Sequence, residues 1–187
     1  MVRHIASLIF GSFVALSLWA EPAGASDIPD AFPLRQTVGG TNLVLNGYGV
    51  RERLFLNVYD CALYAPKASS SAAYLMDVST STAIRIRVNL TPPAEPPARW
   101  EATFRATLAP ELYQRLTHVY EGLAAGDVLL FTYTPDSGTS AFLNGRLVFT
   151  VAGHGLMHGL LDQWLGPQPV SYDLRRALLN VSTDPSL

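Results

Sequence analysis

The sequence predicts one α+β domain built on an antiparallel sheet, and three observations lead to this prediction. Segments with strand character flank a helical stretch, in the order strands, two helices, three strands, two helices. Residues 82–90 alternate apolar and polar side chains with a period of two, as a strand does when one face is buried. Asn144-Gly145 between two apolar runs is the signal of a tight hairpin.

Length and composition favour a single compact domain with a sizeable core. The chain has 187 residues, of which 49% are hydrophobic and 15% charged. Its formal net charge is -2, its basic residues are scattered arginines, and Lys67 is its only lysine. Because nucleic-acid binding needs a basic patch or run, we expect no nucleic-acid partner.

The amino-terminal segment has the pattern of a signal peptide. Arg3 and His4 precede an apolar run over residues 5–20, and Ala23-Gly24-Ala25 provides the small residues that a signal peptidase recognises. The alternative is a membrane anchor, but the run is short of the roughly 20 residues that a spanning helix needs. We therefore predict a signal peptide over residues 1–25 and a mature domain over residues 26–187, periplasmic or secreted, with no stable membrane span after cleavage.

The first half of the domain is predicted to be mainly strands. In the segment 82–90, Ile84, Ile86 and Val88 would face the core, and the intervening arginines would face solvent. The strands are expected at residues 36–38, 41–45, 54–64 and 82–90, with turns at Gly39-Gly40 and over residues 47–53.

The second half is predicted to contain four helices and three strands. Four prolines between residues 91 and 97 break any regular element, and Pro110 suits the first turn of a helix. Gly166 would close one helix, and Ser171 would cap the last. The expected helices are 98–108, 110–123, 156–165 and 171–179, and the expected strands are 128–134, 139–143 and 146–151.

Few residues point to covalent, metal or cofactor chemistry. Cys61 is the only cysteine, so it cannot form a disulfide within the chain, and its apolar strand suggests a small buried side chain. His154 and His158 are four residues apart and could bind a metal with Asp162, but adjacent glycines weaken that helix start. The mature chain has no nucleophile elbow, phosphate-binding loop or dinucleotide fingerprint, so we expect no metal and no cofactor.

Arg51 and Tyr59 are the main candidates for ligand binding. A guanidinium group presents a fork of donors that matches a carboxylate, and a phenol adds one donor beside an apolar wall. If the hairpin turned near residues 52–53, the two residues would lie about five strand positions apart, roughly 16 Å. Arg51 could instead be an exposed turn arginine with Arg53 as the competing candidate, and Tyr59 could simply pack its ring.

An apolar slot would then hold the rest of the ligand. The aromatic residues that could line it are Trp100, Phe104, Phe55 and Tyr64, although aromatic residues at these spacings more often belong to a core.

Several motifs, taken together and in order, resemble the chalcone isomerase superfamily, in particular its bacterial exported members. They are Gly47-Tyr48-Gly49-Val50-Arg51, the strand from Val58-Tyr59 to Leu63-Tyr64, Asn144-Gly145, and Trp164-Leu165-Gly166 followed by Val170-Ser171 and Leu174. The resemblance covers nearly the whole mature chain. It implies an open-faced β-sandwich, in which helices are layered on one side of a large antiparallel sheet with a pocket between them.

The resemblance implies binding more than catalysis. Arg51 matches the arginine of the plant isomerases, whereas Tyr59 stands in place of their threonine, as in the fatty-acid-binding plastid members of the family. Their tyrosine, lysine and asparagine set has no match near residues 94–102, which offer Glu95, Ala98 and Ala102. Gln163 occupies the position of a later serine or threonine.

We therefore expect an exported, non-catalytic binding protein for a fatty acid or a similar small amphiphilic carboxylate. Arg51, Tyr59, Trp100 and Phe104 would bind the ligand, and no residue is assigned a catalytic role. Two alternatives remain: a chalcone isomerase-type intramolecular lyase acting on an enone or phenolic substrate, and an envelope scaffold or interaction protein.

Overall fold

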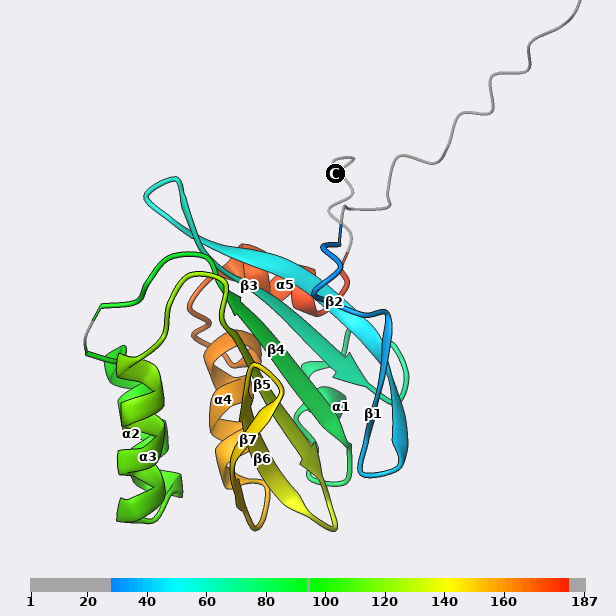
Figure 1. The fold of residues 1–187 in the computed structure, drawn as a ribbon. Coiled ribbons are helices and arrows are strands. Elements are labelled where there is room, and N and C mark those ends of the chain that lie inside the picture. Colours follow the sequence, from blue (N-terminus) through cyan, green and yellow to red (C-terminus); the bar gives the residue numbers. More distant parts are fainter. Residues whose placement is uncertain (1–27, 94, 182–187) are drawn as a thin grey trace, which may run out of the picture.

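Seven strands form one antiparallel sheet, in which each strand pairs with its neighbours along the chain. The computed structural model describes residues 28–93 and 95–181, so the signal peptide expected over residues 1–25 lies outside the described residues. Five helices pack on one side of the sheet, which is strongly curled (Figure 1). The predicted open-faced β-sandwich is confirmed.

The predicted elements recur in order, with differences at their ends. The strands are β1 (Arg35–Val38), β2 (Thr41–Arg53), β3 (Leu56–Ala65), β4 (Thr82–Val88), β5 (Val128–Thr134), β6 (Gly138–Leu143) and β7 (Arg146–Val151). The helices are α1 (Ala72–Leu75), α2 (Ala98–Thr107), α3 (Pro110–Glu121), α4 (Gly155–Leu165) and α5 (Tyr172–Leu178). The single-turn helix α1 was not predicted, because a four-residue helix has too few positions to show a periodicity.

The main core lies between the inner face of the sheet and the helices. Ile84, Ile86 and Val88 of β4 point into it as predicted, and α4 contributes several of its fully buried side chains, among them Trp164. Cys61 is also fully buried there, as expected for a small apolar side chain, and burial raises the pKa of its thiol.

The outer face of the sheet is less open to solvent than the sequence suggested. Phe32, Leu43 and Tyr64 belong to a second, smaller apolar cluster on this face. Arg87 is only half-exposed because it pairs with the buried carboxylate of Asp60 and lies under the ring of Phe32. The arginine face of β4 is therefore partly covered, and it is not fully open to solvent as we expected. The segment before β1 returns over this face, and such long-range packing leaves no local pattern.

Residues 47–53 are not a turn, and this corrects the sequence prediction. β2 continues through them to Arg53. A Cβ atom on Gly47 would lie 2.2 Å from the carbonyl oxygen of Ala177, and one on Gly49 would lie 2.8 Å from the Ala177 side chain. The two glycines are therefore needed for the close approach of α5 to the strand rather than for a turn.

The β2–β3 hairpin turns at Leu54 and Phe55 instead. Both residues have positive φ, at 50° and 66°, in a backbone region that costs a residue with a side chain about 1–2 kcal/mol. The β6–β7 hairpin has the same kind of turn at Asn144 and Gly145, with φ of 49° and 78°. Only the β6–β7 turn uses the residue types that this geometry favours. The sequence therefore indicated that turn and did not indicate the turn at Leu54 and Phe55.

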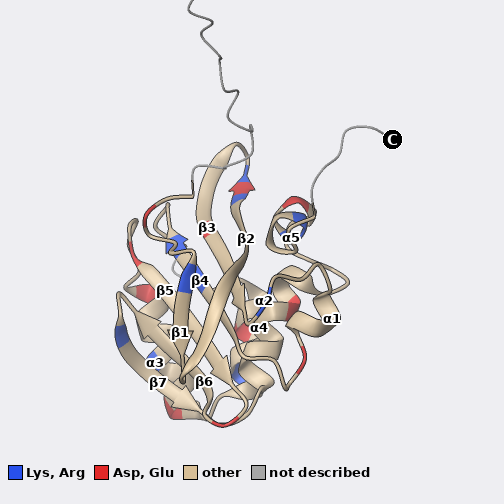
Figure 2. Ribbon diagram, turned by 90° about the vertical axis from the view of Figure 1, so that its right-hand side faces the viewer, with Lys and Arg blue, Asp and Glu red and all other residues tan. Residues whose placement is uncertain are grey.

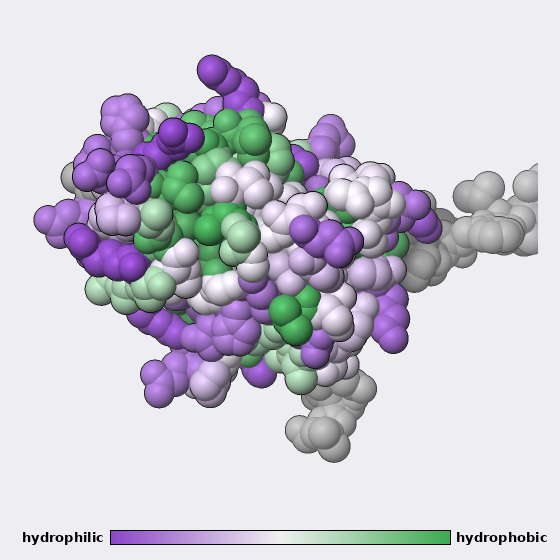
Figure 3. All heavy atoms as spheres, turned by 90° about the horizontal axis from the view of Figure 1, so that it is seen from below, coloured by the Kyte–Doolittle hydropathy of each residue, from purple (hydrophilic) through white to green (hydrophobic). Residues whose placement is uncertain are grey.

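Apolar side chains reach the surface at each of two opposite ends of the molecule. At one end is the tip of the β2–β3 hairpin, where Leu54, Phe55 and Leu56 are exposed. Figure 3, which views the molecule from below relative to Figure 1, shows a patch of apolar side chains on the opposite end, surrounded by hydrophilic ones. Among the residues that the structure describes, no helix combines the length and apolar character required to cross a membrane.

Candidate ligand site

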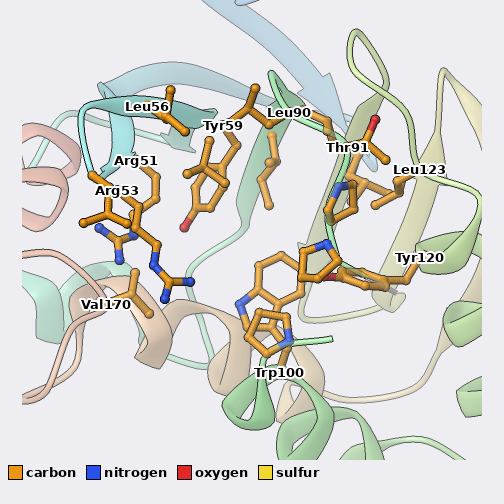
Figure 4. Close-up of a pocket in the computed structure, with 18 residues that line it drawn as sticks. Arg51, Arg53, Leu56, Tyr59, Leu90, Thr91, Trp100, Tyr120, Leu123 and Val170 are labelled. Atoms are coloured by element: carbon orange, nitrogen blue, oxygen red, sulfur yellow. The ribbon is translucent and has the colours of Figure 1, made fainter. Parts of the chain in front are cut away.

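A cavity of about 520 Å³ lies between the hairpin end of the sheet and the segments that carry α2 and α3 (Figure 4). Its wall is predominantly apolar, and its polar side chains are few. The lining residues are Arg51, Arg53, Leu54, Leu56, Val58, Tyr59, Ile86, Val88, Leu90, Thr91, Pro92, Pro93, Pro97, Trp100, Tyr120, Leu123, Leu129 and Val170.

The strand register brings Arg51 and Tyr59 together. Arg51 of β2 pairs directly with Tyr59 of β3, and Tyr59 pairs with Val88 of β4. Directly opposed residues of antiparallel strands have Cα atoms about 4.5–5.5 Å apart and point to the same face. The expected separation of roughly 16 Å is therefore wrong. The turn lies beyond Arg53, and a register shift between Arg51 and Glu52 places Arg51 opposite Tyr59.

Two arginines lie at the hairpin end of the cavity. In Figure 4 the side chains of Arg51 and Arg53 extend on the same side as the Tyr59 ring. Arg51 donates one hydrogen bond, from Nη1 to the carbonyl oxygen of Glu52 at 2.5 Å. In the described part of the chain neither arginine forms an ion pair with a carboxylate. Both guanidinium groups are thus available to an anionic ligand, and Arg53, the competing candidate, joins Arg51.

Tyr59 has a defined partner in the core. Its hydroxyl oxygen accepts a hydrogen bond from Nε1 of Trp164 at 2.9 Å. Burial raises the pKa of Tyr59 strongly, the buried Cys61 thiol raises it further, and the Trp164 hydrogen bond and Arg51 only partly oppose this. The phenol therefore stays protonated. Since its oxygen is already an acceptor, its own proton remains available to a ligand atom in the cavity.

Trp100 joins the cavity wall to the core behind it. Its ring meets Trp164 edge to face, with ring centroids 5.9 Å apart, and meets Phe104 in the same way at 5.9 Å. Phe104 itself is buried in the main core and is not among the lining residues. It therefore supports the wall from behind.

The two remaining aromatic candidates lie elsewhere. Phe55 is fully exposed at the hairpin tip, and Tyr64 belongs to the cluster on the outer face of the sheet. The expectation that they line the slot is wrong, since one occupies the turn and the other points to the opposite face.

Sequence reasoning missed a large part of the far wall. Pro92, Pro93 and Pro97 lie in the segment before α2, where prolines were interpreted only as helix breakers. Tyr120 at the end of α3 donates a long hydrogen bond of 3.5 Å to the carbonyl oxygen of Glu95 in the same segment. The available signal was the apolar, proline-rich stretch that directly follows Leu90, because an apolar segment that lies outside regular elements can border a ligand-binding groove.

Among the described residues that line the cavity, none has a side chain that could take up a proton near neutral pH. Among the lining residues the titratable ones are two arginines and the phenols of Tyr59 and Tyr120, and burial raises the pKa of both phenols. His154 and His158 pack edge to face beside Tyr133, and neither is among the lining residues. In the described residues no group of three or more His, Cys, Asp or Glu side chains is placed to hold a metal ion.

A curled antiparallel sheet with helices on one face and an apolar cavity under the β2–β3 hairpin defines an open-faced β-sandwich with a pocket of small-molecule size. The family model for chalcone isomerase-like proteins matches residues 29–180. The chain belongs to the chalcone isomerase-like family.

One solved structure illustrates the shared fold. A fatty-acid binding protein of Arabidopsis thaliana, AtFAP1, is 20% identical in sequence and superposes with a TM-score of 0.56. The match covers 80% of this chain and 91% of the Arabidopsis chain. Among curated protein sequences, none matches the chain.

Proposed function

We propose that this protein is a non-catalytic binding protein for a fatty acid or a similar small amphiphilic carboxylate. The observation that carries the proposal is one apolar cavity with two unpaired guanidinium groups at a single end. An acid with a hydrocarbon tail has the matching distribution of charge and apolar surface. The fold is also that of a fatty-acid binding protein, AtFAP1.

The size of the cavity supports this assignment. About 520 Å³ lies within the range of roughly 300–1,000 Å³ that small-molecule pockets occupy. Each buried methylene contributes about 0.8 kcal/mol, so a plain apolar wall can hold a tail without specific contacts. The carboxylate would accept hydrogen bonds from Arg51 and from the Tyr59 hydroxyl, and Arg53 would add a second positive charge.

Two features favour binding over the alternatives. A ring-closing or lyase reaction requires proton transfer, and the described residues of the lining offer no side chain that could act as a base near neutral pH. A pure scaffold needs no cavity, whereas this one remains unfilled by the protein's own side chains although Trp100 and Tyr120 border it.

Isothermal titration calorimetry with dodecanoic acid and dodecanol tests the proposal. We expect the acid to bind and the alcohol to bind at least tenfold more weakly, because a hydrogen bond to a charged group contributes about 1.5–3 kcal/mol. Equal affinity for the acid and the alcohol would show that the arginines do not recognise the carboxylate. If neither dodecanoic acid nor dodecanol binds and the protein turns over a chalcone, its function is catalysis and not binding.

We also propose that the protein is exported and acts in the periplasm or outside the cell. The support is the sequence over residues 3–25, with its basic start, apolar run and small residues. Intact mass measurement after expression of the full chain tests this. A mass that corresponds to cleavage after Ala25 is the expected result, and an uncleaved chain in the cytoplasmic fraction would refute it.

A further inference from the structure

The tip of the β2–β3 hairpin presents three consecutive apolar side chains to solvent. Leu54 is 81% exposed, Phe55 is 101% exposed and Leu56 is 56% exposed. Two of the three, Leu54 and Leu56, also border the cavity. The hairpin projects from the body of the sheet beyond the packed helices (Figure 1).

The residues at the turn are poorly suited to their backbone. Leu54 and Phe55 adopt the positive φ that favours asparagine and glycine, and the same chain uses Asn144-Gly145 where an equivalent turn connects β6 and β7. Leu54 and Phe55 therefore disfavour the turn and also expose apolar surface. Phe55, which is fully exposed, has no packing contact that would offset these costs, whereas contact with an apolar phase would offset them.

Charge beside the tip indicates what that phase is. Arg51 and Arg53 precede the turn, with Glu52 between them, and this part of β2 carries its charges close to the tip (Figure 2). An apolar tip flanked by arginines is the arrangement of elements that enter the interface of an anionic bilayer. Apolar side chains then insert among the acyl chains, and cations remain at the phosphates.

We propose that the β2–β3 hairpin tip docks on the surface of an anionic lipid bilayer. In the ligand-free protein, Phe55 and Leu54 insert below the headgroups, and Arg53 contacts lipid phosphates. Because Leu54 and Leu56 border the cavity, docking brings the hairpin end of the cavity to the bilayer surface. Transfer of an acid between the bilayer and the cavity would follow, and that last step alone rests on the proposed function.

A flotation assay with lipid vesicles tests the docking, using ligand-free protein. The vesicles contain equal parts of phosphatidylglycerol and phosphatidylcholine, and a second set contains phosphatidylcholine alone. We expect wild-type protein to float with the anionic vesicles. Phosphatidylcholine alone or high salt should weaken binding several-fold, because each arginine near an anionic surface contributes about a fivefold gain.

Phe55→Gly is the decisive variant. Glycine suits the φ of 66°, so the thermal midpoint should not fall, while removal of the aromatic side chain should weaken vesicle binding at least tenfold. Phe55→Leu keeps an apolar tip and should retain most of the binding. Leu147→Ser serves as the matched control, because Leu147 is 59% exposed on β7, at the opposite edge of the sheet.

A double variant, Leu54→Asn with Phe55→Gly, gives this turn the residue types of the β6–β7 turn. It should fold at least as stably as the wild type and lose vesicle binding further. If wild-type protein fails to float, or if Phe55→Gly floats as well as wild type, the docking proposal is overturned. An apolar tip that matters only for a protein partner would give one or the other of these two results.

Titration with dodecanoic acid in vesicle-free buffer separates the two proposals. Phe55 is outside the cavity lining, so Phe55→Gly should bind the acid with unchanged affinity. Vesicle binding that depends on Phe55 but is accompanied by no acid binding would refute the proposed function and leave the docking intact. Acid binding by a wild-type protein that does not float would refute the docking and leave the proposed function intact.

Discussion

Arg51 and Tyr59 face each other directly across β2 and β3, although seven residues separate them in the sequence. A guanidinium group and a protonated phenol are thereby placed at one end of an apolar cavity. Pairing of β2 with β3 fixes both residues, and the hydrogen bond from Trp164 in the core also fixes the Tyr59 hydroxyl. The geometry provides charge-assisted and neutral donors for one small anionic group.

Replacing Arg51 by glutamine should weaken the binding of dodecanoic acid by about 10- to 100-fold. The reason is the loss of a charged donor, which contributes about 1.5–3 kcal/mol to such a hydrogen bond. Calorimetric titration measures the change. Arg146→Gln removes an exposed arginine on β7 and is the matched control, with unchanged affinity. Equal affinities for the wild type and Arg51→Gln would show that the carboxylate does not lie at this end of the cavity.

Affinity should rise with the length of the acyl chain. Each added methylene that enters the cavity contributes about 0.8 kcal/mol, which is about a fourfold gain in affinity. The gain should stop when the chain fills the cavity. Titration of a series of saturated fatty acids gives this profile, and the point where it levels off reports the usable length of the cavity. A flat profile from the shortest acid onward would mean that the tail remains in water.

Tyr59→Phe should reduce both stability and affinity. The indole N–H of Trp164 is buried and would lose its acceptor, which costs about 1–3 kcal/mol of the free energy of unfolding. Urea denaturation monitors this change, and Tyr172→Phe, at an exposed tyrosine of α5, should stay within about 0.5 kcal/mol of wild type. Loss of the phenol should weaken acid binding about fivefold. An unchanged unfolding free energy would argue against the hydrogen bond to Trp164.

Gly47→Ala tests why β2 contains glycine. The added Cβ would lie 2.2 Å from the carbonyl oxygen of Ala177 and 2.5 Å from that of Leu178, so backbone must move. We expect a loss of about 2–3 kcal/mol in the free energy of unfolding, typical of severe overpacking. Gly122→Ala is the control, because its nearest neighbour would be 3.6 Å away and its φ is negative. Equal stability of the two variants would indicate that α5 does not pack closely against Gly47 of β2.

The stability of the protein should fall on mild acidification because of His154. Burial, together with the neighbouring His158, lowers the pKa of His154 below its ordinary value of 6.5, and Asp77 only partly opposes this. The unfolded chain therefore binds the extra proton more readily, so this contribution to stability is present above about pH 6.5 and is lost as the pH falls below it.

His154→Gln should flatten the change in urea midpoint between about pH 7 and pH 5. His118→Gln, at an exposed position of α3, is the matched control and should keep the wild-type profile. The carboxyl groups of Asp77 and Asp127, whose pKa values are lowered chiefly by hydrogen bonds to Ser79 and Asn144, act only at lower pH. A wild-type profile in His154→Gln would assign the acid sensitivity to other groups.

Local patterns in the sequence were sufficient for most elements of the fold. The alternation in β4, the proline at the start of α3 and the Asn144-Gly145 turn all depend on neighbouring residues, and the structure confirms each one. The resemblance to the chalcone isomerase superfamily added the layered arrangement of helices on one side of the sheet.

The errors arose where distant segments decide the structure. Gly47 suggested a turn because a sequence does not show that α5 packs against it, and the actual turn at Leu54 and Phe55 lacks the residues that usually mark one. The same limitation applied to the site. Arg51 was found from its local motif, whereas the Trp164 partner of Tyr59 is 105 residues away in the chain.

Native mass spectrometry of the purified protein shows directly whether an acid is bound. We predict that wild-type protein carries a small carboxylic acid, either as isolated or after incubation with dodecanoic acid, at one acid per chain. A variant with both Arg51→Gln and Arg53→Gln should lose most of this bound acid. A wild-type protein that stays at its ligand-free mass in both conditions would refute binding of a fatty acid in the cavity.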